Sequence, residues 1–204
     1  MRISEQVICK EFPCLDVQHE CYIVPHVSIN PEDISVVLIS EAAPADISDY
    51  YYAVGDPHYQ QTTVHAFNEA GVQVASLQEI LELGVYLTTA VKCAKTGYGI
   101  NAGTIKECSM LLEQELELFP NLEAFLLMGD VAIKALNYIA KRQGEPRVIP
   151  AGSTYKIRGG EFYYRAKRAF PSYTQTGPSY GIEKSKQRMI AEDIASALEV
   201  VREV

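Results

Sequence analysis

The strongest constraint on the fold is a strand–helix–strand pattern between residues 84 and 128. The stretch Val85–Ala90 is short, apolar and β-rich, and Ala124–Met128 is a second apolar run. Between them, a helical pattern starts at Thr104, with apolar residues spaced three and four positions apart. Two nearly continuous apolar strands joined by a helix predict a parallel sheet that helices cover on both faces.

The remaining elements extend this α/β pattern in both directions. Ile34–Ser40 reads as a buried strand, residues 62–70 and 130–142 read as helices, and Ser76 with Glu79 forms a capping box. Tyr155–Arg158 and Phe162–Phe170 are predicted as strands that flank a turn at Gly159-Gly160. A long helix over residues 183–204 completes the prediction.

Composition indicates an ordinary globular protein. The chain has 204 residues, of which 48% are hydrophobic and 22% are charged, and this predicts a single domain over residues 1–204. Its apolar runs fall well short of the ~18 residues of a membrane span, and its first residues lack the apolar core of a signal peptide. We therefore expect a cytoplasmic protein that does not contact membranes, and no feature indicates an obligate protein partner.

Charge is unevenly distributed along the chain. Residues 1–140 contain 6 Lys and Arg against 19 Asp and Glu, whereas residues 141–188 contain 11 against 3. A locally basic segment can bind phosphates although the formal net charge of the whole chain is −8. The alternative is that these charges form an ordinary solvated face.

Five cysteines in a reducing compartment favour free thiols or metal ligation over disulfides. Cys9 and Cys14 are far in sequence from Cys93 and Cys108, and four thiolates brought together by folding would suit an iron–sulfur cluster or zinc. Buried free cysteine is also common in protein cores, and Cys108 lies on the apolar stripe of its predicted helix.

The loop of residues 40–59 follows the first predicted strand, where open α/β sheets place their ligands. Glu41, Asp46 and Asp49 are candidates for orienting a water molecule as general base, although carboxylates in this position can also cap the next helix. This loop, called the tyrosine loop below, contains four tyrosines within ten residues, which favours a ligand with a flat ring.

The basic segment contains a third candidate site. Arg158, Lys167 and Arg168 alternate with tyrosines, a combination that fits a phosphate backbone with exposed bases. An edge strand protected by charge would have the same composition.

Several of these motifs together resemble the uracil-DNA glycosylase superfamily, in particular its iron–sulfur branch. The resemblance is spread over residues 9–180. Residues 39–44 (ISEAAP) are similar to a strand ending in G-E-x-P-G, and residues 85–93 (VYLTTAVKC) resemble V-Y-I-T-N-x-V-K-C. Residues 107–108 (EC), 125–136 (FLLMGDVAIKAL), 156–159 (KIRG) and 178–180 (PSY) resemble later motifs of the family.

The resemblance implies a three-layer α/β/α sandwich with a central four-stranded parallel sheet. It also implies binding of single- or double-stranded DNA and a structural 4Fe-4S cluster held by Cys93, Cys108, Cys9 and Cys14, with Cys21 spare. Zinc, or no metal, remains the alternative cofactor assignment.

The sequence departs from the family at the residues that perform the chemistry. The family's uracil-reading Asn aligns with Thr89, and its catalytic His aligns with Gly177 or, in another register, with Phe170. The base-stacking aromatic falls near Tyr52, and Glu41 matches cleanly. Gln175 and Ser179 in the last loop are the expected substitutes for the missing polar groups.

These departures leave two functional hypotheses. In the first, the protein flips a damaged base out of DNA and hydrolyses its N-glycosidic bond in DNA repair. In the second, the same fold is catalytically silent and keeps a pocket for nucleic acid or a nucleotide. Losing one preorganised hydrogen-bond donor typically costs about 2.7–4 kcal/mol of transition-state stabilisation, so the missing Asn and His favour the second hypothesis. Glu41 and the tyrosine loop favour the first.

Overall fold

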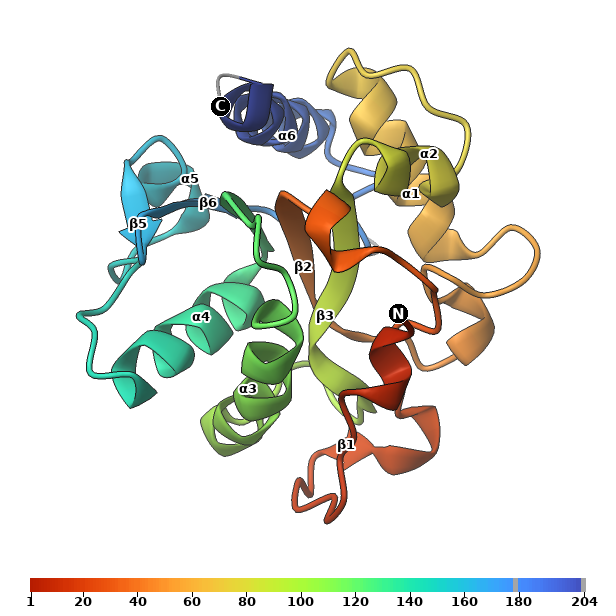
Figure 1. The fold of residues 1–204 in the computed structure, drawn as a ribbon, viewed down its shortest axis with the longest axis vertical. Coiled ribbons are helices and arrows are strands. Elements are labelled where there is room, and N and C mark those ends of the chain that lie inside the picture. Colours follow the sequence, from red (N-terminus) through yellow and green to blue (C-terminus); the bar gives the residue numbers. More distant parts are fainter. Residues whose placement is uncertain (178–179, 203–204) are drawn as a thin grey trace.

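A computed structural model describes residues 1–177 and 180–202. Its centre is a six-stranded sheet with the order β1-β3-β2-β4-β6-β5 (Figure 1). The strands are β1 (Val17–Gln18), β2 (Val36–Ala43), β3 (Val85–Lys95), β4 (Ala124–Met128), β5 (Phe162–Tyr164) and β6 (Lys167–Ser172). The four central strands are mutually parallel, and short antiparallel strands flank them on both sides. The α/β class is as predicted, but the sheet has six strands rather than four.

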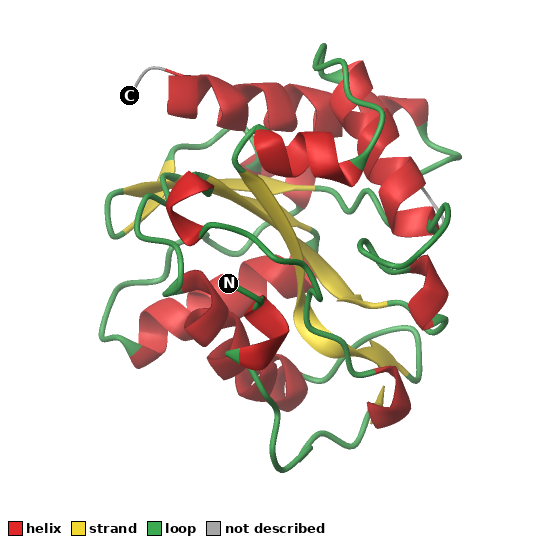
Figure 2. Cartoon of the chain, turned by 45° about the vertical axis from the view of Figure 1, so that its right-hand side comes forward, coloured by secondary structure: helices red, strands yellow, loops and turns green. Residues whose placement is uncertain are grey.

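Helices cover both faces of the sheet (Figure 2). One apolar core lies between the sheet and α3 (Ala102–Leu116) and α4 (Asp130–Arg142). A second core lies between the sheet and α1 (His58–Glu69), α2 (Leu77–Glu82) and α6 (Lys184–Arg202). Strand β2 shows why the central strands are continuously apolar. Val37 and Ile39 enter the first core, whereas Val36 and Leu38 enter the second.

Several local predictions are confirmed. Helix α4 has the predicted bounds, and β4 covers the predicted run. The amide of Glu79 donates to Ser76 Oγ over 3.3 Å, as in a capping box, while the Glu79 carboxylate accepts over 2.9 Å from the amide of Ala75, one residue before the N-cap of α2. None of the helices in the described part of the chain combines the length and apolar content needed to cross a bilayer.

The prediction for the late hairpin is wrong in two places. Residues Thr154–Ile157 form the short helix α5 rather than a strand. The chain reverses at Arg165 and Ala166, with φ of 49° and 63°, rather than at the two glycines. The predicted strand Phe162–Phe170 is therefore divided into β5 and the start of β6. The sequence does not predict a turn at Arg165 and Ala166, because residues other than glycine rarely adopt positive φ.

Candidate functional site

The carboxyl ends of the four parallel strands meet at one edge of the sheet, where the chain places Glu41. Its carboxylate lies against Gly129, which follows β4 and precedes α4. A Cβ atom at residue 129 would lie 2.6 Å from Glu41 Oε1, and the φ of Gly129 is 103°. The amide of Val131 in the first turn of α4 donates to the same oxygen over 3.5 Å. The glycine thus allows the half-buried carboxylate to occupy the helix N-terminus, where the helix dipole favours negative charge.

The phenol of Tyr59 lies close to Glu41. Tyr59 on α1 donates a hydrogen bond to the carbonyl of Ala42 over 3.0 Å. Burial raises the pKa of Tyr59 to about 12, with the Thr176 hydroxyl acting in the opposite direction and the negative charge of Glu41 acting in the same direction. The phenol is therefore protonated at neutral pH. A carboxylate, a phenol and a hydroxyl from three separate segments share this edge of the sheet.

The other two predicted catalytic carboxylates contact the starts of helices. Asp46 accepts hydrogen bonds from the amide and the hydroxyl of Ser48, over 2.9 and 2.7 Å, and caps the 3₁₀ turn Ile47–Asp49. These hydrogen bonds lower the pKa of the exposed Asp46 carboxyl. Asp49 accepts from the amide of His58, the first residue of α1, over 3.3 Å. This geometry matches the capping alternative that the sequence left open.

Two of the predicted base-binding residues lie inside the protein. Thr89 and Gln175 are both 0% exposed. Gln175 Nε2 donates to the hydroxyls of Tyr51 and Thr63 over 3.0 and 3.3 Å, and its Oε1 accepts from Ser40 Oγ over 3.4 Å. The amide of Gln175 thus links β2, the tyrosine loop and α1. Gly177 is partly buried, and its carbonyl accepts a hydrogen bond from the amide of Tyr180 over 2.9 Å. Ser179 lies outside the described residues.

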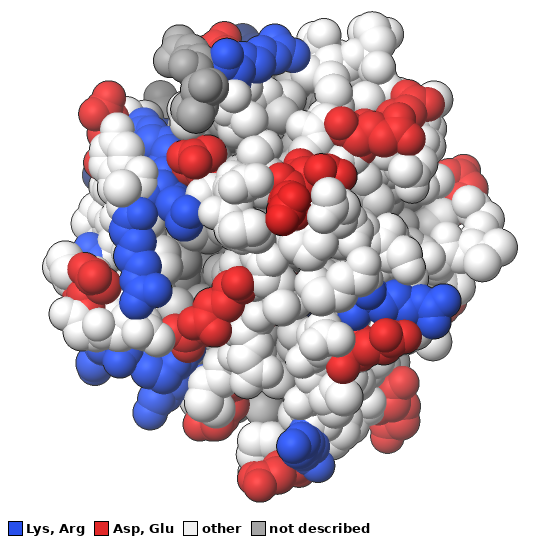
Figure 3. Space-filling model, in the orientation of Figure 1, with Lys and Arg blue, Asp and Glu red and all other residues white. Residues whose placement is uncertain are grey.

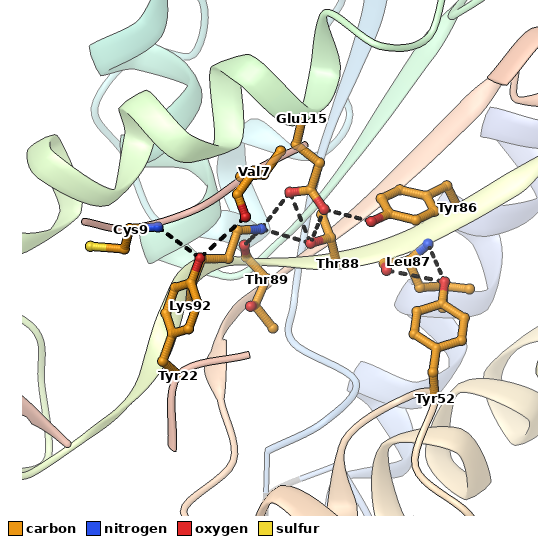
Figure 4. Close-up of polar contacts among 10 residues, drawn as sticks. All are labelled: Val7, Cys9, Tyr22, Tyr52, Tyr86, Leu87, Thr88, Thr89, Lys92 and Glu115. Carbon is orange, nitrogen blue, oxygen red and sulfur yellow. Dashed lines mark hydrogen bonds and ion pairs between the residues drawn. The ribbon is translucent and has the colours of Figure 1, made fainter. Parts of the chain in front are cut away.

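Tyr52, the predicted base-stacking residue, contacts the sheet. Its hydroxyl accepts from the amide of Leu87 and donates to the Leu87 carbonyl, both over 3.1 Å (Figure 4). Its ring lies nearly parallel to that of Tyr86, with the centroids 6.4 Å apart. Leu87 is in register with Leu38 of β2, and Tyr52 completes the backbone hydrogen bonding on the other edge of β3, where β1 pairs only with Ala94 and Lys95.

Two of the three predicted DNA-binding residues, Lys167 and Arg168, lie away from Glu41, whereas Arg158 contacts Asp193, which accepts a hydrogen bond from Ser172 at the carboxyl end of β6. Arg168 is aligned with Ala124 at the start of β4, whereas Ser172 is aligned with Met128 at its end, so the basic end of β6 marks the amino edge of the parallel strands. The side chains of Lys167 and Arg168 donate to main-chain carbonyls. Arg158 pairs with Asp193 of α6 over 2.7 Å. Basic side chains gather over β5 at the left of Figure 3, with acidic ones among them.

Three of the four predicted cysteine ligands line one cavity, and the fourth is near them. Cys9, Cys14 and Cys108 line a cavity of about 570 Å³ between the N-terminal segment and α3. Burial raises the pKa of the Cys93 thiol to about 12, and the neighbouring Cys108, Cys9 and Cys14 raise it further. Cys21 instead donates to the carbonyl of Ala45 over 3.2 Å. The donor chemistry thus fits a metal centre, and a bound metal would deprotonate these thiols. In the described ranges, however, no three His, Cys, Asp or Glu side chains converge closely enough to hold a metal ion.

Sequence reasoning missed a buried polar cluster beneath the site. Lys92 and Glu115 form an ion pair whose side chains are both 0% exposed (Figure 4). Lys92 Nζ also donates to Thr88 Oγ1 and to the carbonyl of Thr89, each over 2.7 Å, and Tyr86 donates to Glu115 over 2.6 Å. A signal was available, because Glu115 falls on the apolar stripe of its helix and Lys92 lies within an apolar strand.

Comparison with known proteins supports a relationship to the uracil-DNA glycosylases. No protein-family profile matches the chain. A curated relative, the type-5 uracil-DNA glycosylase of Thermus thermophilus, is 29% identical over 96 residues. The match covers 46% of this chain and 43% of that enzyme, so the chain spans less than half the length of its relative. The chain is thus similar to part of a uracil-DNA glycosylase.

Proposed function

We propose that this chain is a uracil-DNA glycosylase-like protein that binds DNA and hydrolyses the N-glycosidic bond of a flipped, damaged base. The observation that carries the proposal is the Glu41 carboxylate at the carboxyl edge of the sheet, next to the N-terminus of α4. Ligands of open α/β sheets bind at this edge. The name of the matched relative supports DNA as the substrate and a role in DNA repair.

In the proposed reaction, Glu41 orients a water molecule towards the sugar carbon that carries the base. The water oxygen bonds to that carbon, the C–N bond breaks, and the bonding electron pair leaves with the base. The proton of the water passes to the Glu41 carboxylate. Tyr59 is protonated at neutral pH and close to Glu41, and its hydrogen bond to the carbonyl of Ala42 holds the strand next to Glu41 in place.

Two of the groups proposed to hold the base, Thr89 and Gln175, lie inside the protein. Thr89, Gln175, Gly177 and Ser179 remain our candidates for its edge, and Tyr52 for its face. Because Thr89 and Gln175 are completely buried, base binding requires the tyrosine loop to move aside. Two buried hydroxyls, those of Thr89 and Tyr50, have no hydrogen-bond partner in the described structure, and a bound base edge would supply one.

We further propose that Cys9, Cys14, Cys93 and Cys108 hold a 4Fe-4S cluster, with zinc as the alternative. The cavity lined by Cys9, Cys14 and Cys108 and the nearness of Cys93 support the assignment, and metal binding would draw these thiols closer together than they are in the described structure. When bound, such a cluster would fix the N-terminal segment to the sheet.

A second candidate function is recognition without chemistry. One specific observation favours it: the side-chain amide of Gln175 forms its hydrogen bonds with Tyr51, Thr63 and Ser40, inside the protein. In this second function, Gln175 stabilises the core of the protein instead of holding a base, and the fold binds nucleic acid without cleaving it.

One experiment separates the two functions. Base release is measured from labelled single- and double-stranded oligonucleotides that contain uracil, hypoxanthine or xanthine. We expect release by the wild-type protein and a loss of about 10²–10⁴-fold in Glu41→Gln, as for other general bases. Asp46→Asn is the matched control, since asparagine also caps helices and activity should be unchanged. Binding of DNA without release would support recognition alone, and equal release by Glu41→Gln would remove Glu41 from the mechanism.

A further inference from the structure

The loop between β3 and α3 presents an aromatic ring entirely to solvent. Tyr98 lies at the tip of this loop, between Gly97 and Gly99, and is 102% exposed. Ser40 is aligned with Thr89 and Ala43 with Ala94, so the loop leaves the sheet at the edge that carries Glu41. A fully exposed tyrosine contributes no apolar burial to the fold. At the edge of the sheet that carries Glu41, the exposed ring is accessible to a ligand that binds there.

The loop is held at both ends by a single residue. The carbonyl of Asp16 accepts hydrogen bonds from the amide and the hydroxyl of Thr96, over 3.2 and 3.0 Å. The carboxylate of Asp16 accepts from the amide of Asn101 over 2.6 Å and from the Thr104 hydroxyl. Because both ends of the loop are fixed before any ligand binds, little conformational entropy is lost when Tyr98 makes a contact.

A positive charge accompanies the ring. Lys95 Nζ lies 6.0 Å from the centroid of the Tyr98 ring and donates to the Tyr98 carbonyl over 3.3 Å. Across residues 1–177 and 180–202, Lys95 makes no ion pair with a carboxylate. The lysine therefore remains available to an external anion. An exposed aromatic ring next to an unneutralised ammonium is the combination that binds single-stranded nucleic acid.

We propose that Tyr98 and Lys95 form a nucleic-acid contact beside the candidate site. The Tyr98 ring stacks on an unpaired base of the strand, and Lys95 pairs with a backbone phosphate. This inference rests on the proposed function, because it takes DNA as the ligand. It replaces the basic segment, in which Lys167 and Arg168 lie at the opposite edge of the sheet and all three predicted DNA-binding residues, Arg158 included, are engaged in contacts within the protein.

The absence of tryptophan from the sequence provides a direct test. Tyr98→Trp introduces one fluorophore into the loop between β3 and α3. Tyr163→Trp introduces one into the hairpin formed by β5 and β6. Tyr163 is the matched control because it is also exposed, at 55%, and has the Arg168 guanidinium 5.1 Å from its ring centroid. Unlabelled single-stranded oligonucleotide is titrated into each variant. We expect a stacked base to quench the fluorescence of Tyr98→Trp, whereas the fluorescence of Tyr163→Trp should stay unchanged.

A second measurement gives the affinity. Binding of a fluorescein-labelled single-stranded oligonucleotide is followed by anisotropy. Tyr98→Ala should weaken binding about five- to 150-fold, the range for loss of one stacked base, whereas Tyr98→Phe should bind like the wild type. Lys95→Gln should weaken binding and reduce the magnitude of the salt slope by about one phosphate contact.

The outcomes distinguish this contact from the proposed function. Oligonucleotide binding that quenches Tyr163→Trp rather than Tyr98→Trp, or that has an unchanged affinity in Tyr98→Ala, would overturn the contact and leave the proposed function standing. A wild-type protein that binds neither single- nor double-stranded oligonucleotide would overturn both.

Discussion

Lys92 and Glu115 form an ion pair from which solvent is completely excluded, between β3 and α3. Thr88 and Tyr86 complete the hydrogen bonding of the pair, and the lysine also contacts the carbonyl of Thr89. A charged pair without access to water is tolerated only when its remaining polar atoms are also satisfied. This cluster therefore holds the carboxyl end of β3 in place below the candidate site.

We first predict that breaking this pair destabilises the fold more than removing it. Lys92→Met leaves Glu115 buried without its partner and should lower the free energy of unfolding by about 3–5 kcal/mol. The double variant Lys92→Met/Glu115→Leu should recover much of this loss, because no uncompensated charge remains. Urea denaturation of the wild type and the three variants gives the coupling energy. Single and double variants of equal stability would contradict the prediction.

The second prediction concerns the contact between Gly129 and Glu41. Gly129→Ala would combine positive φ with a Cβ atom 2.6 Å from Glu41 Oε1. The control is Gly144→Ala, which has a φ of 75° and no atom within 4 Å of the new Cβ. The control should lose about 1–2 kcal/mol from backbone strain alone, and Gly129→Ala should lose more. Base release should fall only in Gly129→Ala, because only that change displaces Glu41. Equal losses of stability would show that the carboxylate moves aside freely.

The third prediction is a pH dependence that comes from Asp193. Burial raises the pKa of this carboxyl above its ordinary value of 3.8, although the Arg158 guanidinium and the Ser172 hydroxyl act in the opposite direction. The folded state therefore binds this proton more readily than the unfolded state. The resulting stabilisation is complete below pH 3.8 and is lost as the pH rises through the pKa of the folded state.

Asp193→Asn tests this sign. The free energy of unfolding of the wild type, measured relative to Asp193→Asn, should decrease as the pH is raised from about 3.8 towards neutrality. Urea denaturation at intervals of pH provides the two curves. Parallel curves, or a difference that grows with pH, would contradict the prediction.

The fourth prediction concerns the cysteines. Protein purified without oxygen should contain iron and show the visible absorption of an iron–sulfur cluster. Cys93→Ser and Cys108→Ser should lose both signals, because each removes one proposed ligand. Cys21→Ser is the control, since the thiol of Cys21 donates to the carbonyl of Ala45 and lies outside the proposed set. Equal loss of iron in Cys21→Ser would reassign the ligands, and zinc in place of iron would favour the alternative metal.

Sequence alone determined the elements whose signals are local. The apolar runs Val85–Ala90 and Ala124–Met128, joined by a helix, predicted a parallel sheet covered on both faces, and the capping box at Ser76 predicted the start of α2. Such signals depend on side chains only a few positions apart. The turn at Arg165 and Ala166 escaped prediction because its backbone conformation, with positive φ in two residues that are not glycine, goes against local preference.

Only the tertiary structure decided what the polar residues do. Sequence could not distinguish a catalytic carboxylate from a capping one, and the structure places Asp46 and Asp49 at the starts of helices but Glu41 beside Gly129. It also buried Gln175 in a hydrogen-bonded network with Tyr51. The physical reason is that the role of a polar side chain depends on its solvent exposure and on partners from distant segments. Both are set when the layers of the fold pack together.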